Sequence, residues 1–237
     1  MVSLIIPFYN CEDMAGSTVN KVKEYLRQHK GIEFIAINDG STDGTLKALK
    51  SLEGGYMRVV GYEKNKGKGG AIQAGVAAAR GDKIVFTDAD LAYGLEPLER
   101  FIAALDTADI AVGTRREDSE ISKRYGILRA VASKTFSALC EHMLHLGLSD
   151  TQCGFKAYRA EAAKELFSKL SIMRFGFDFE ILAMARNYGY NIKSIPVTLL
   201  NNSVCSNVSV IGDGFKMLCE IYQIRRKLKK TERKRRL

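Results

Sequence analysis

The sequence lacks the features of a membrane-spanning or disulfide-stabilised protein. It contains no stretch of about 18 uncharged apolar residues, so we predict no transmembrane helix. The N-terminal segment, MVSLIIPFYN, carries no basic residues and is typical of a β-strand, so we expect no signal peptide. The five cysteines form no C-x-x-C pair, and an odd, scattered set indicates reduced thiols in a cytosolic protein.

The sequence also lacks interdomain linkers, and it lacks an excess of basic residues before position 225. No Pro-, Ser- or Gly-rich segment divides the 237 residues before the tail, and 46% of them are hydrophobic, which suits one large domain. The net charge of +9 is concentrated in residues 225–237, which hold nine Lys or Arg and one acid and so contribute +8. A nearly neutral body argues against a nucleic-acid-binding fold with a basic face. We predict a domain over residues 1–224 and a basic tail over 225–237.

Short apolar segments alternate with helical patterns through the first half of the chain. This rhythm predicts an α/β fold with a mostly parallel central sheet covered by helices on both faces. Ligands of such sheets bind at the carboxyl ends of the strands. The predicted strands are residues 2–7, 34–37, 57–62 and 83–87, and the predicted helices are 18–29, a segment around 46–52, and 69–80.

After residues 109–114 the rhythm changes, and the pattern predicts longer helices with two further strands. The predicted helices are residues 121–146, 161–170, 177–188 and 214–230, and the strands lie near 155–158 and at 192–197. The last helix is amphipathic and leads into the basic tail.

Two aspartates, Asp88 and Asp90, follow the fourth predicted strand in the sequence T-D-A-D-L. In an extended segment, side chains two residues apart point to the same side, so both carboxylates can reach one cation. Oxygen ligands suit a hard ion such as Mg²⁺ or Mn²⁺. The alternative is a solvated acidic turn, which the position at the end of a buried strand disfavours.

The loop after the second strand reads N-D-G-S-T-D-G-T from Asn38 to Thr45. Asn38 and Asp39 stand at a strand end, where they either bind a ligand or only form a turn. Asp43 or Thr45 can cap the next helix, and we expect only that role for Asp43.

The loop after the third strand, E-K-N-K-G-K-G-G, is rich in glycine and lysine. Glycines let the backbone approach an anion, and a helix N-terminus favours phosphate. The loop matches neither a P-loop nor a dinucleotide-binding fingerprint. Considered alone, it is equally typical of a flexible surface loop.

Taken together, five ordered motifs resemble glycosyltransferase family 2, the large family of inverting enzymes that use nucleotide sugars. The motifs are P-F-Y-N, N-D-G-S-T-D-G-T, N-x-G-K-G-x-A, D-A-D-L and G-T-R. The later segments S-D-T-Q-C-G-F-K and R-F-G-F-D-F-E are similar to its dolichyl- or polyprenyl-phosphate glucosyltransferase and mannosyltransferase branch. The resemblance covers about residues 1–224 and implies a GT-A-like fold, with a donor half near 1–115 and an acceptor half near 116–224.

The resemblance implies a donor site at the strand ends. The family usually has an aspartate that pairs with the base where this chain has Asn38, and an amide still offers an acceptor and adds a donor. The expected donor residues are Pro7 and Tyr9 at the nucleobase, Asn38 and Asp39 beside it, Lys68 at the phosphates and Asp88 at the ribose or sugar, with Asp90 as the metal ligand.

The resemblance also implies an acceptor site. The branch often closes a basic loop over the diphosphate, but this chain has the uncharged Asn207 there, in C-S-N-V. Arg129 is alternatively an exposed helix charge. The expected acceptor residues are Arg115, Arg129 and Ser133 at the lipid phosphate, with Gln152 and Lys156 at the border.

The chemistry expected of such a site depends on the acceptor. A cation held by Asp90 would stabilise the departing nucleoside diphosphate. A phosphate acceptor has a second pKa near ~6 and needs cations to hold it, not a base. A hydroxyl acceptor needs a general base, for which Asp178 and Glu180 are the candidates. Both acids are alternatively favourable charges at a helix N-terminus.

We therefore expect transfer of a hexose, from a donor of the UDP-glucose or GDP-mannose type, to a polyprenyl phosphate. The basic tail would bind an anionic membrane surface on its cytoplasmic face, or else be a solvated run of charge. The alternatives are a family 2 transferase acting on a glycan hydroxyl, or a non-catalytic module that binds nucleotide sugars. A sugar nucleotidyltransferase is disfavoured, because P-F-Y-N replaces the Gly-rich run expected after the first strand.

Overall fold

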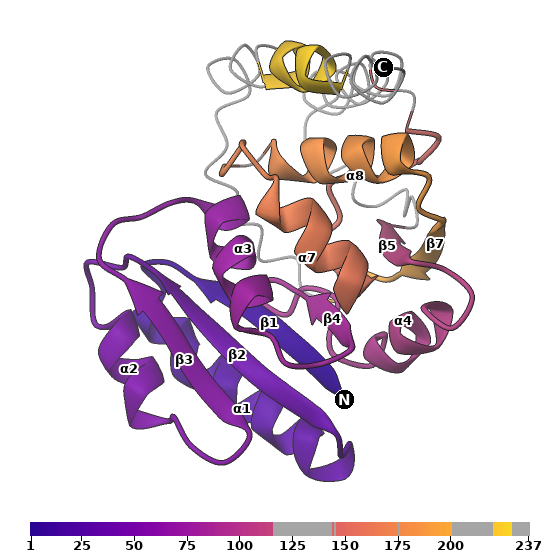
Figure 1. Ribbon diagram of the computed structural model, residues 1–237. Helices are drawn as coiled ribbons and strands as arrows, with labels where there is room; N and C mark the ends of the chain where they lie inside the picture. The colour runs from indigo at the N-terminus through magenta and orange to yellow at the C-terminus, as the bar shows by residue number, and fades with distance from the viewer. Residues whose placement is uncertain (116–143, 145, 175, 201–219, 229–237) are drawn as a thin grey trace, which may run out of the picture.

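A seven-stranded mixed sheet forms the centre of the computed structural model (Figure 1), which describes residues 1–115, 144, 146–174, 176–200 and 220–228. The strand order is β3-β2-β1-β4-β6-β5-β7, and all neighbours are parallel except β6, which is antiparallel to both β4 and β5. The strands are β1 (Val2–Phe8), β2 (Ile32–Asp39), β3 (Met57–Tyr62), β4 (Lys83–Phe86), β5 (Ile110–Arg115), β6 (Lys156–Arg159) and β7 (Ile192–Val197).

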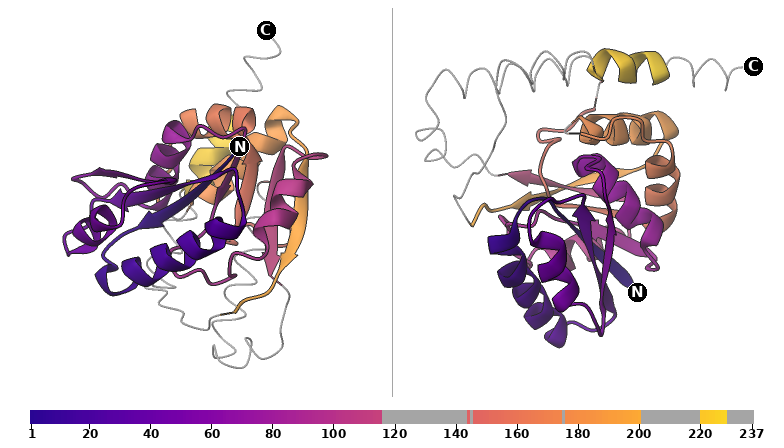
Figure 2. Two further views of the ribbon diagram at one scale, coloured as in Figure 1. Left: turned by 90° about the horizontal axis from the view of Figure 1, so that it is seen from below. Right: turned by 90° about the vertical axis from the view of Figure 1, so that its left-hand side faces the viewer.

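Helices cover both faces of the sheet, and alternate strand residues point to opposite layers. Leu4 and Ile6 of β1 belong to the core cluster beneath α1, α2 and α4, whereas Ile5 between them belongs to the cluster shared with α3, α7 and α8. This period of two is the expected consequence of burying a strand on both faces. Figure 2 shows the two helix layers from the side and from below. The helices are α1 (Glu12–Gln28), α2 (Thr45–Ser51), α3 (Lys68–Ala78), α4 (Leu98–Ala104), α7 (Ala160–Ser168) and α8 (Phe177–Tyr188).

The structure confirms the predicted α/β class and extends several predicted elements. The predicted bounds of β3, α8 and β7 agree with the structure, but α1 begins at Glu12 instead of residue 18 and β2 runs from Ile32 to Asp39. The sequence analysis missed α4, a seven-residue helix whose apolar face packs beneath the sheet. Residues 220–228 are helical, in agreement with the predicted terminal helix. The predicted helix over 121–146 lies almost wholly outside the described residues.

The antiparallel strand β6 is the feature that brings the later part of the chain to the site. Because β6 runs against β4, its first residue, Lys156, pairs with the last residue of β4, Phe86. The segment before β6 therefore arrives at the carboxyl end of β4, where the D-A-D motif begins.

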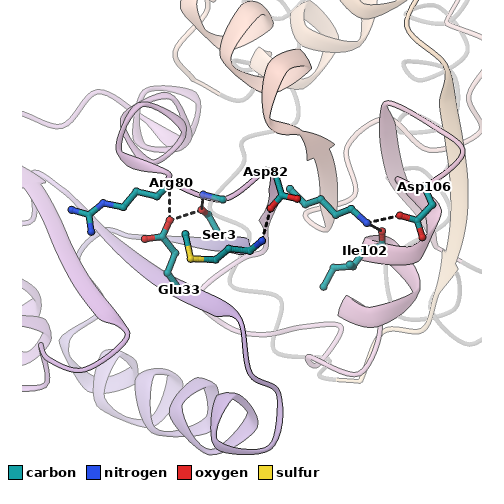
Figure 3. Close-up of polar contacts among 9 residues, drawn as sticks. Ser3, Glu33, Arg80, Asp82, Ile102 and Asp106 are labelled. Atoms are coloured by element: carbon teal, nitrogen blue, oxygen red, sulfur yellow. Dashed lines mark hydrogen bonds and ion pairs between the residues drawn. The ribbon is translucent and has the colours of Figure 1, made fainter.

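The amino-terminal edge of the sheet is closed by polar contacts (Figure 3). The buried Glu33 carboxylate accepts hydrogen bonds from Ser3 Oγ at 2.5 Å and from the Arg80 backbone N–H at 2.7 Å. The Lys83 ammonium donates to Asp106 at 2.6 Å. Within the described part of the chain, no helix is both long and apolar enough to span a membrane.

Candidate functional site at the carboxyl edge of the sheet

The carboxyl ends of three adjacent strands, β2, β1 and β4, meet at one edge of the sheet. The loops that follow them are N-D-G-S-T-D-G-T, P-F-Y-N and D-A-D-L, so the topology places three of the sequence motifs side by side. This edge is where open α/β sheets bind their ligands.

Asp88 lies just beyond β4 and forms an ion pair with Lys68, the first residue of α3. Its carboxylate also rests on the backbone of Gly154, where a Cβ atom would lie 1.9 Å from Asp88 Oδ2. Burial opposes the charge on Lys68, but the negative charges of Asp88 and Asp178 outweigh it and raise the lysine pKa. The site thus keeps a full positive charge at a helix N-terminus, where a phosphate would bind.

Asp90 follows in a tight turn. Leu91 adopts a left-handed backbone conformation with φ of 47°, and the Asp90 Oδ1 atom accepts a hydrogen bond from the Ala92 N–H at 3.1 Å. The Thr18 hydroxyl of α1 holds the same turn by donating to the Ala89 carbonyl at 2.6 Å. Burial and the adjacent charge of Asp88 raise the pKa of Asp90. The turn therefore holds more negative charge than Lys68 alone compensates.

The donor set fits a hard divalent cation. Asp88 and Asp90 are two residues apart, and burial together with the charge of Asp88 raises the pKa of Asp90, so a cation bound to them would stabilise both carboxylates. Among the described residues, no three His, Cys, Asp or Glu side chains gather into a group able to hold a metal ion. Mg²⁺ commonly takes one or two carboxylates and completes its shell with water and substrate phosphates. Asp88 and Asp90 would hold such an ion, with a diphosphate supplying further oxygens.

Asn38 and Asp39 end β2 and differ in how their oxygens are used. Asn38 is 1% exposed, and its Oδ1 atom has no hydrogen-bond partner within the described part of the chain. Asp39 is equally buried, but it accepts from the Tyr62 hydroxyl at 2.6 Å, the Lys66 N–H at 2.9 Å and the Asn65 amide at 2.9 Å. Asn38 thus offers a free acceptor, whereas Asp39 fixes the loop that leads to Lys68.

The backbone of the Gly-rich loop packs closely against Met173 and Phe177. Gly67 has φ of 86°, which favours glycine, and a Cβ atom there would lie 2.8 Å from the Met173 carbonyl oxygen. A Cβ at Gly69 would meet the Phe177 Cβ at 2.6 Å. The loop is therefore held by Asp39 on one side and by the R-F-G-F segment on the other, instead of being a freely solvated loop.

The P-F-Y-N turn is joined to the loop after β2. Asn10 has a left-handed φ of 46°, and its side-chain oxygen accepts from the Thr42 N–H at 2.8 Å. Asp43 accepts from the N–H groups of Thr45 and Glu12, the first residues of α2 and α1, which confirms its predicted capping role. Tyr9 is 50% exposed beside this junction. Pro7 is half-buried near the end of β1. The predicted contacts of Pro7 and Tyr9 with a nucleobase stay predictions.

Lys156 and Asp178 form a buried ion pair at 2.7 Å behind Asp88 and Lys68. The Lys156 side chain is fully buried and also donates to the Cys153 carbonyl at 2.6 Å. Burial raises the pKa of Asp178, although the nearby Lys156 and Lys68 lower it in part. The Lys156 ammonium faces the protein interior, and its predicted place at the border of the acceptor site stays a prediction. Asp178 lies in the first turn of α8, where a negative charge is favourable.

Glu180, the other predicted base candidate, is not available for proton transfer. It is fully buried and accepts hydrogen bonds from the Ser171 N–H at 3.0 Å and the Ile172 N–H at 2.7 Å. The Lys227 ammonium pairs with it at 2.5 Å. Its carboxylate is occupied by structural contacts.

Arg115, at the end of β5, forms a bidentate ion pair with Asp150. The Nε–Oδ2 and Nη2–Oδ1 distances are 2.7 and 2.9 Å, and the Arg115 contacts lower the pKa of Asp150 despite its burial. Asp150 was not predicted, although it stands in the S-D-T-Q-C-G-F-K segment. Gln152 is exposed beside this pair. Arg129, Ser133 and Asn207 lie outside the described residues, so their predicted roles stay predictions.

Comparison with known proteins now gives the family. The sequence profile described as "Glycosyl transferase family 2" matches residues 3–167. The chain belongs to this family. Human dolichyl-phosphate beta-glucosyltransferase is 33% identical over 215 residues, which cover 83% of this chain and 66% of the relative. The mouse protein of the same name is 35% identical over 204 residues, which cover 78% of this chain and 63% of that protein.

Solved structures confirm the fold of this family 2 member. Glucosyl-3-phosphoglycerate synthase from Mycobacterium tuberculosis, in complex with UDP, superposes with a TM-score of 0.72 at 18% identity, covering 95% of this chain and 80% of that chain. A complex of that synthase with Mn²⁺, UDP and glucosyl-3-phosphoglycerate gives a TM-score of 0.63 at 19% identity, covering 84% of this chain and 70% of that chain. The predicted GT-A-like fold is therefore confirmed.

Proposed function

We propose that this chain is an inverting glycosyltransferase that moves glucose from a nucleoside-diphosphate donor to a dolichyl or other polyprenyl phosphate. The observation that carries the proposal is the grouping of Lys68, Asp88 and Asp90 at the carboxyl edge of the sheet. The names of the human and mouse relatives favour glucose over mannose and a lipid phosphate over other acceptors.

The donor would be held at both of its ends. Asn38 offers a buried acceptor oxygen to a base N–H, with Pro7 and Tyr9 beside it. Lys68 and the N-terminal amides of α3 would face the diphosphate. A divalent cation on Asp88 and Asp90 would supply Lewis-acid stabilisation of the leaving group. The Lys68 ammonium, which pairs with Asp88, could then also contact the phosphates of a bound donor.

A phosphate acceptor explains why the described site offers no accessible base. Asp178 is paired with Lys156, and Glu180 is fully engaged by structural hydrogen bonds. A phosphate monoester is already anionic near neutral pH, so it needs cationic neighbours and no base. Arg115 would contribute the edge of its guanidinium that Asp150 leaves uncovered, and Arg129 and Ser133 would complete the phosphate site. A glycan hydroxyl acceptor would need Asp178 as its base, and the ion pair with Lys156 disfavours that role.

Attachment to an anionic membrane on its cytoplasmic face completes the proposal. The C-terminal helix buries Ile221 and Ile224 and exposes Tyr222, Arg225 and Arg226. Lys227 pairs with the buried Glu180, so we propose that the other basic residues of the tail contact the membrane. The remaining basic residues, beyond 228, lie outside the described part of the chain.

The experiment is a screen of UDP-glucose and GDP-mannose against a short polyprenyl phosphate with Mn²⁺, with products read by mass. We expect glucosyl phosphopolyprenol from the wild type, and no product from Asp90→Ala or after chelation of the metal. Transfer to soluble sugars at full rate without lipid would overturn the acceptor. Activity that survives Asp90→Ala would overturn the cation site, and a wild type that binds both nucleotides but transfers nothing would indicate a non-catalytic module.

A further inference from the structure

The C-terminal helix, residues 220–228, packs on the outer side of α8 and reaches the segment before it (Figures 1 and 2). Near its end, Lys227 Nζ pairs with Glu180 Oε1 and donates to the Lys169 carbonyl, both at 2.5 Å. At its start, the Glu220 carboxylate lies against Gly176, where a Cβ atom would be 2.1 Å from Glu220 Oε2. The helix therefore contacts both flanks of residues 171–174, which we call the connecting segment.

Glu180 transmits this contact to the connecting segment. Its buried carboxylate accepts the backbone N–H groups of Ser171 and Ile172 and the Ser171 hydroxyl, the last at 2.5 Å. A fully buried carboxylate is stable only with a compensating charge, and among the described residues Lys227 is the cation that pairs with it. Without Lys227, the carboxylate would lose its paired cation, and its hold on the two N–H groups would weaken.

The connecting segment in turn shapes the Gly-rich loop. The Met173 carbonyl accepts the Gly70 N–H at 3.2 Å and lies so close to Gly67 that no side chain could fit there. Gly67 and Gly70 lie on either side of Lys68 in the sequence, and the Lys68 ammonium pairs with Asp88. Contacts therefore run without a break from the C-terminal helix through Glu180 and Met173 to the amides that precede and begin α3.

We infer that Lys227 and Glu180 are positioning residues for the donor site. By fixing the connecting segment, they hold the backbone of residues 67–70 in the conformation that receives a nucleoside diphosphate. The inference rests on the proposed function only for the identity of that ligand. It predicts that the docked C-terminal helix and the bound nucleotide stabilise each other, because each favours the same arrangement of the connecting segment.

Two variants of the same helix test the inference. Lys227→Met and Arg226→Met each remove one positive charge, but Arg226 is exposed and none of the contacts above involves it. We expect Lys227→Met to weaken UDP binding, measured by titration calorimetry with Mn²⁺, by about 5-fold or more. We also expect faster hydrogen exchange at the Gly70 amide. Arg226→Met should change neither, and Lys227→Arg, which keeps the charge, should retain most of both.

The outcomes separate this inference from the proposed function. If Lys227→Met binds UDP as the wild type does and exchanges the Gly70 amide at the same rate, the inference is wrong. If the wild type binds neither UDP nor GDP, the proposed function fails, and unchanged exchange at Gly70 would then overturn the positioning role as well. Should Lys227→Met not fold, Ser171→Ala removes the hydroxyl that donates to Glu180 and accepts from Lys227, while both residues of the ion pair stay in place. It should produce a smaller loss of affinity, and an unchanged affinity would overturn the inference.

Discussion

At the amino-terminal end of β2, the Glu33 carboxylate accepts hydrogen bonds from Ser3, Arg80 and Arg58, whereas at the carboxyl-terminal end of the same strand the buried Asn38 oxygen has no described partner. The contrast extends along the sheet. Thr87, which follows β4, and Thr114, at the end of β5, also carry buried hydroxyls without partners in the described chain. The Glu33 carboxylate is satisfied by internal contacts, whereas three buried oxygens at the carboxyl edge, those of Asn38, Thr87 and Thr114, have no partner in the described chain. Burying an unpaired polar group costs stability, so the carboxyl edge sacrifices stability for binding.

The largest effect should come from Lys156→Met, which breaks the buried charge pair behind the site. The variant would leave the Asp178 carboxylate without its partner in a buried position. We expect unfolding free energy, measured by urea denaturation, to fall by about 3–5 kcal/mol. The double variant Lys156→Met with Asp178→Leu should recover much of the loss. Equal stability of the single variant and the wild type would contradict the pair.

Asp90→Asn should show most clearly that the carboxyl edge of the sheet serves activity and not stability. Removing the carboxylate would lower kcat by roughly 10²–10³-fold, the usual size of losing one charge-stabilising group. Because burial and Asp88 raise the pKa of Asp90, its ionisation opposes folding, and the variant should be at least as stable as the wild type. Thermal denaturation beside the transfer assay checks both. A large loss of stability would show that Asp90 has a structural role instead.

Gly154→Ala tests whether the position of the Asp88 carboxylate requires a residue without a side chain at position 154. The added methyl would occupy the position of the Asp88 Oδ2 atom and force that carboxylate to rotate away from Lys68. A displacement of this size can lower the rate by about 10²-fold, while the fold should tolerate the change because only a side-chain end must move. Activity equal to the wild type would mean that the position of Asp88 is not critical.

Glu33→Gln should have the opposite profile, with normal activity per folded molecule and lower stability. Despite its burial, hydrogen bonds from Ser3, Arg80 and Arg58 lower the pKa of Glu33 below the ordinary 4.5. Its contribution is therefore fully present above pH 4.5 and is lost as pH falls through the lower, folded-state pKa.

At neutral pH we expect Glu33→Gln to cost about 1–3 kcal/mol in urea unfolding. The difference from wild type should shrink in acid, where the wild-type carboxyl is protonated too. A pH-independent difference would contradict the assigned cause.

The sequence predicts that Lys68, Asp88 and Asp90 gather at the carboxyl edge of the sheet, because their positions depend on local order. Asp88, Asp90 and Lys68 each follow or begin an element whose apolar period is clear, and the parallel topology then brings the ends together. The short helix α4 escaped prediction because a seven-residue segment has too few turns to display a helical period.

The surroundings of Lys156 and Glu180 depend on long-range packing that no local pattern in the sequence records. Lys156 stands in a motif that suggests ligand contact, yet its pairing with Phe86 directs the ammonium inward to Asp178, 22 residues further along the chain. Likewise, Glu180 looks like a candidate base, and only the folded chain reveals that two backbone amides and Lys227 surround it. A charged residue in a motif predicts that charge is needed, but not whether it faces ligand or protein.

The antiparallel strand β6 has a consequence for how this enzyme scaffold can be divided. Because β6 lies between β4 and β5, a fragment ending at residue 115 would keep β4 on β1 but would leave β5 without either of its neighbouring strands. The earlier and later parts of the chain therefore share one continuous hydrogen-bonded sheet. Exchanging acceptor modules between relatives would require the transplant to carry β6 and the residues before it, not merely everything after a convenient junction.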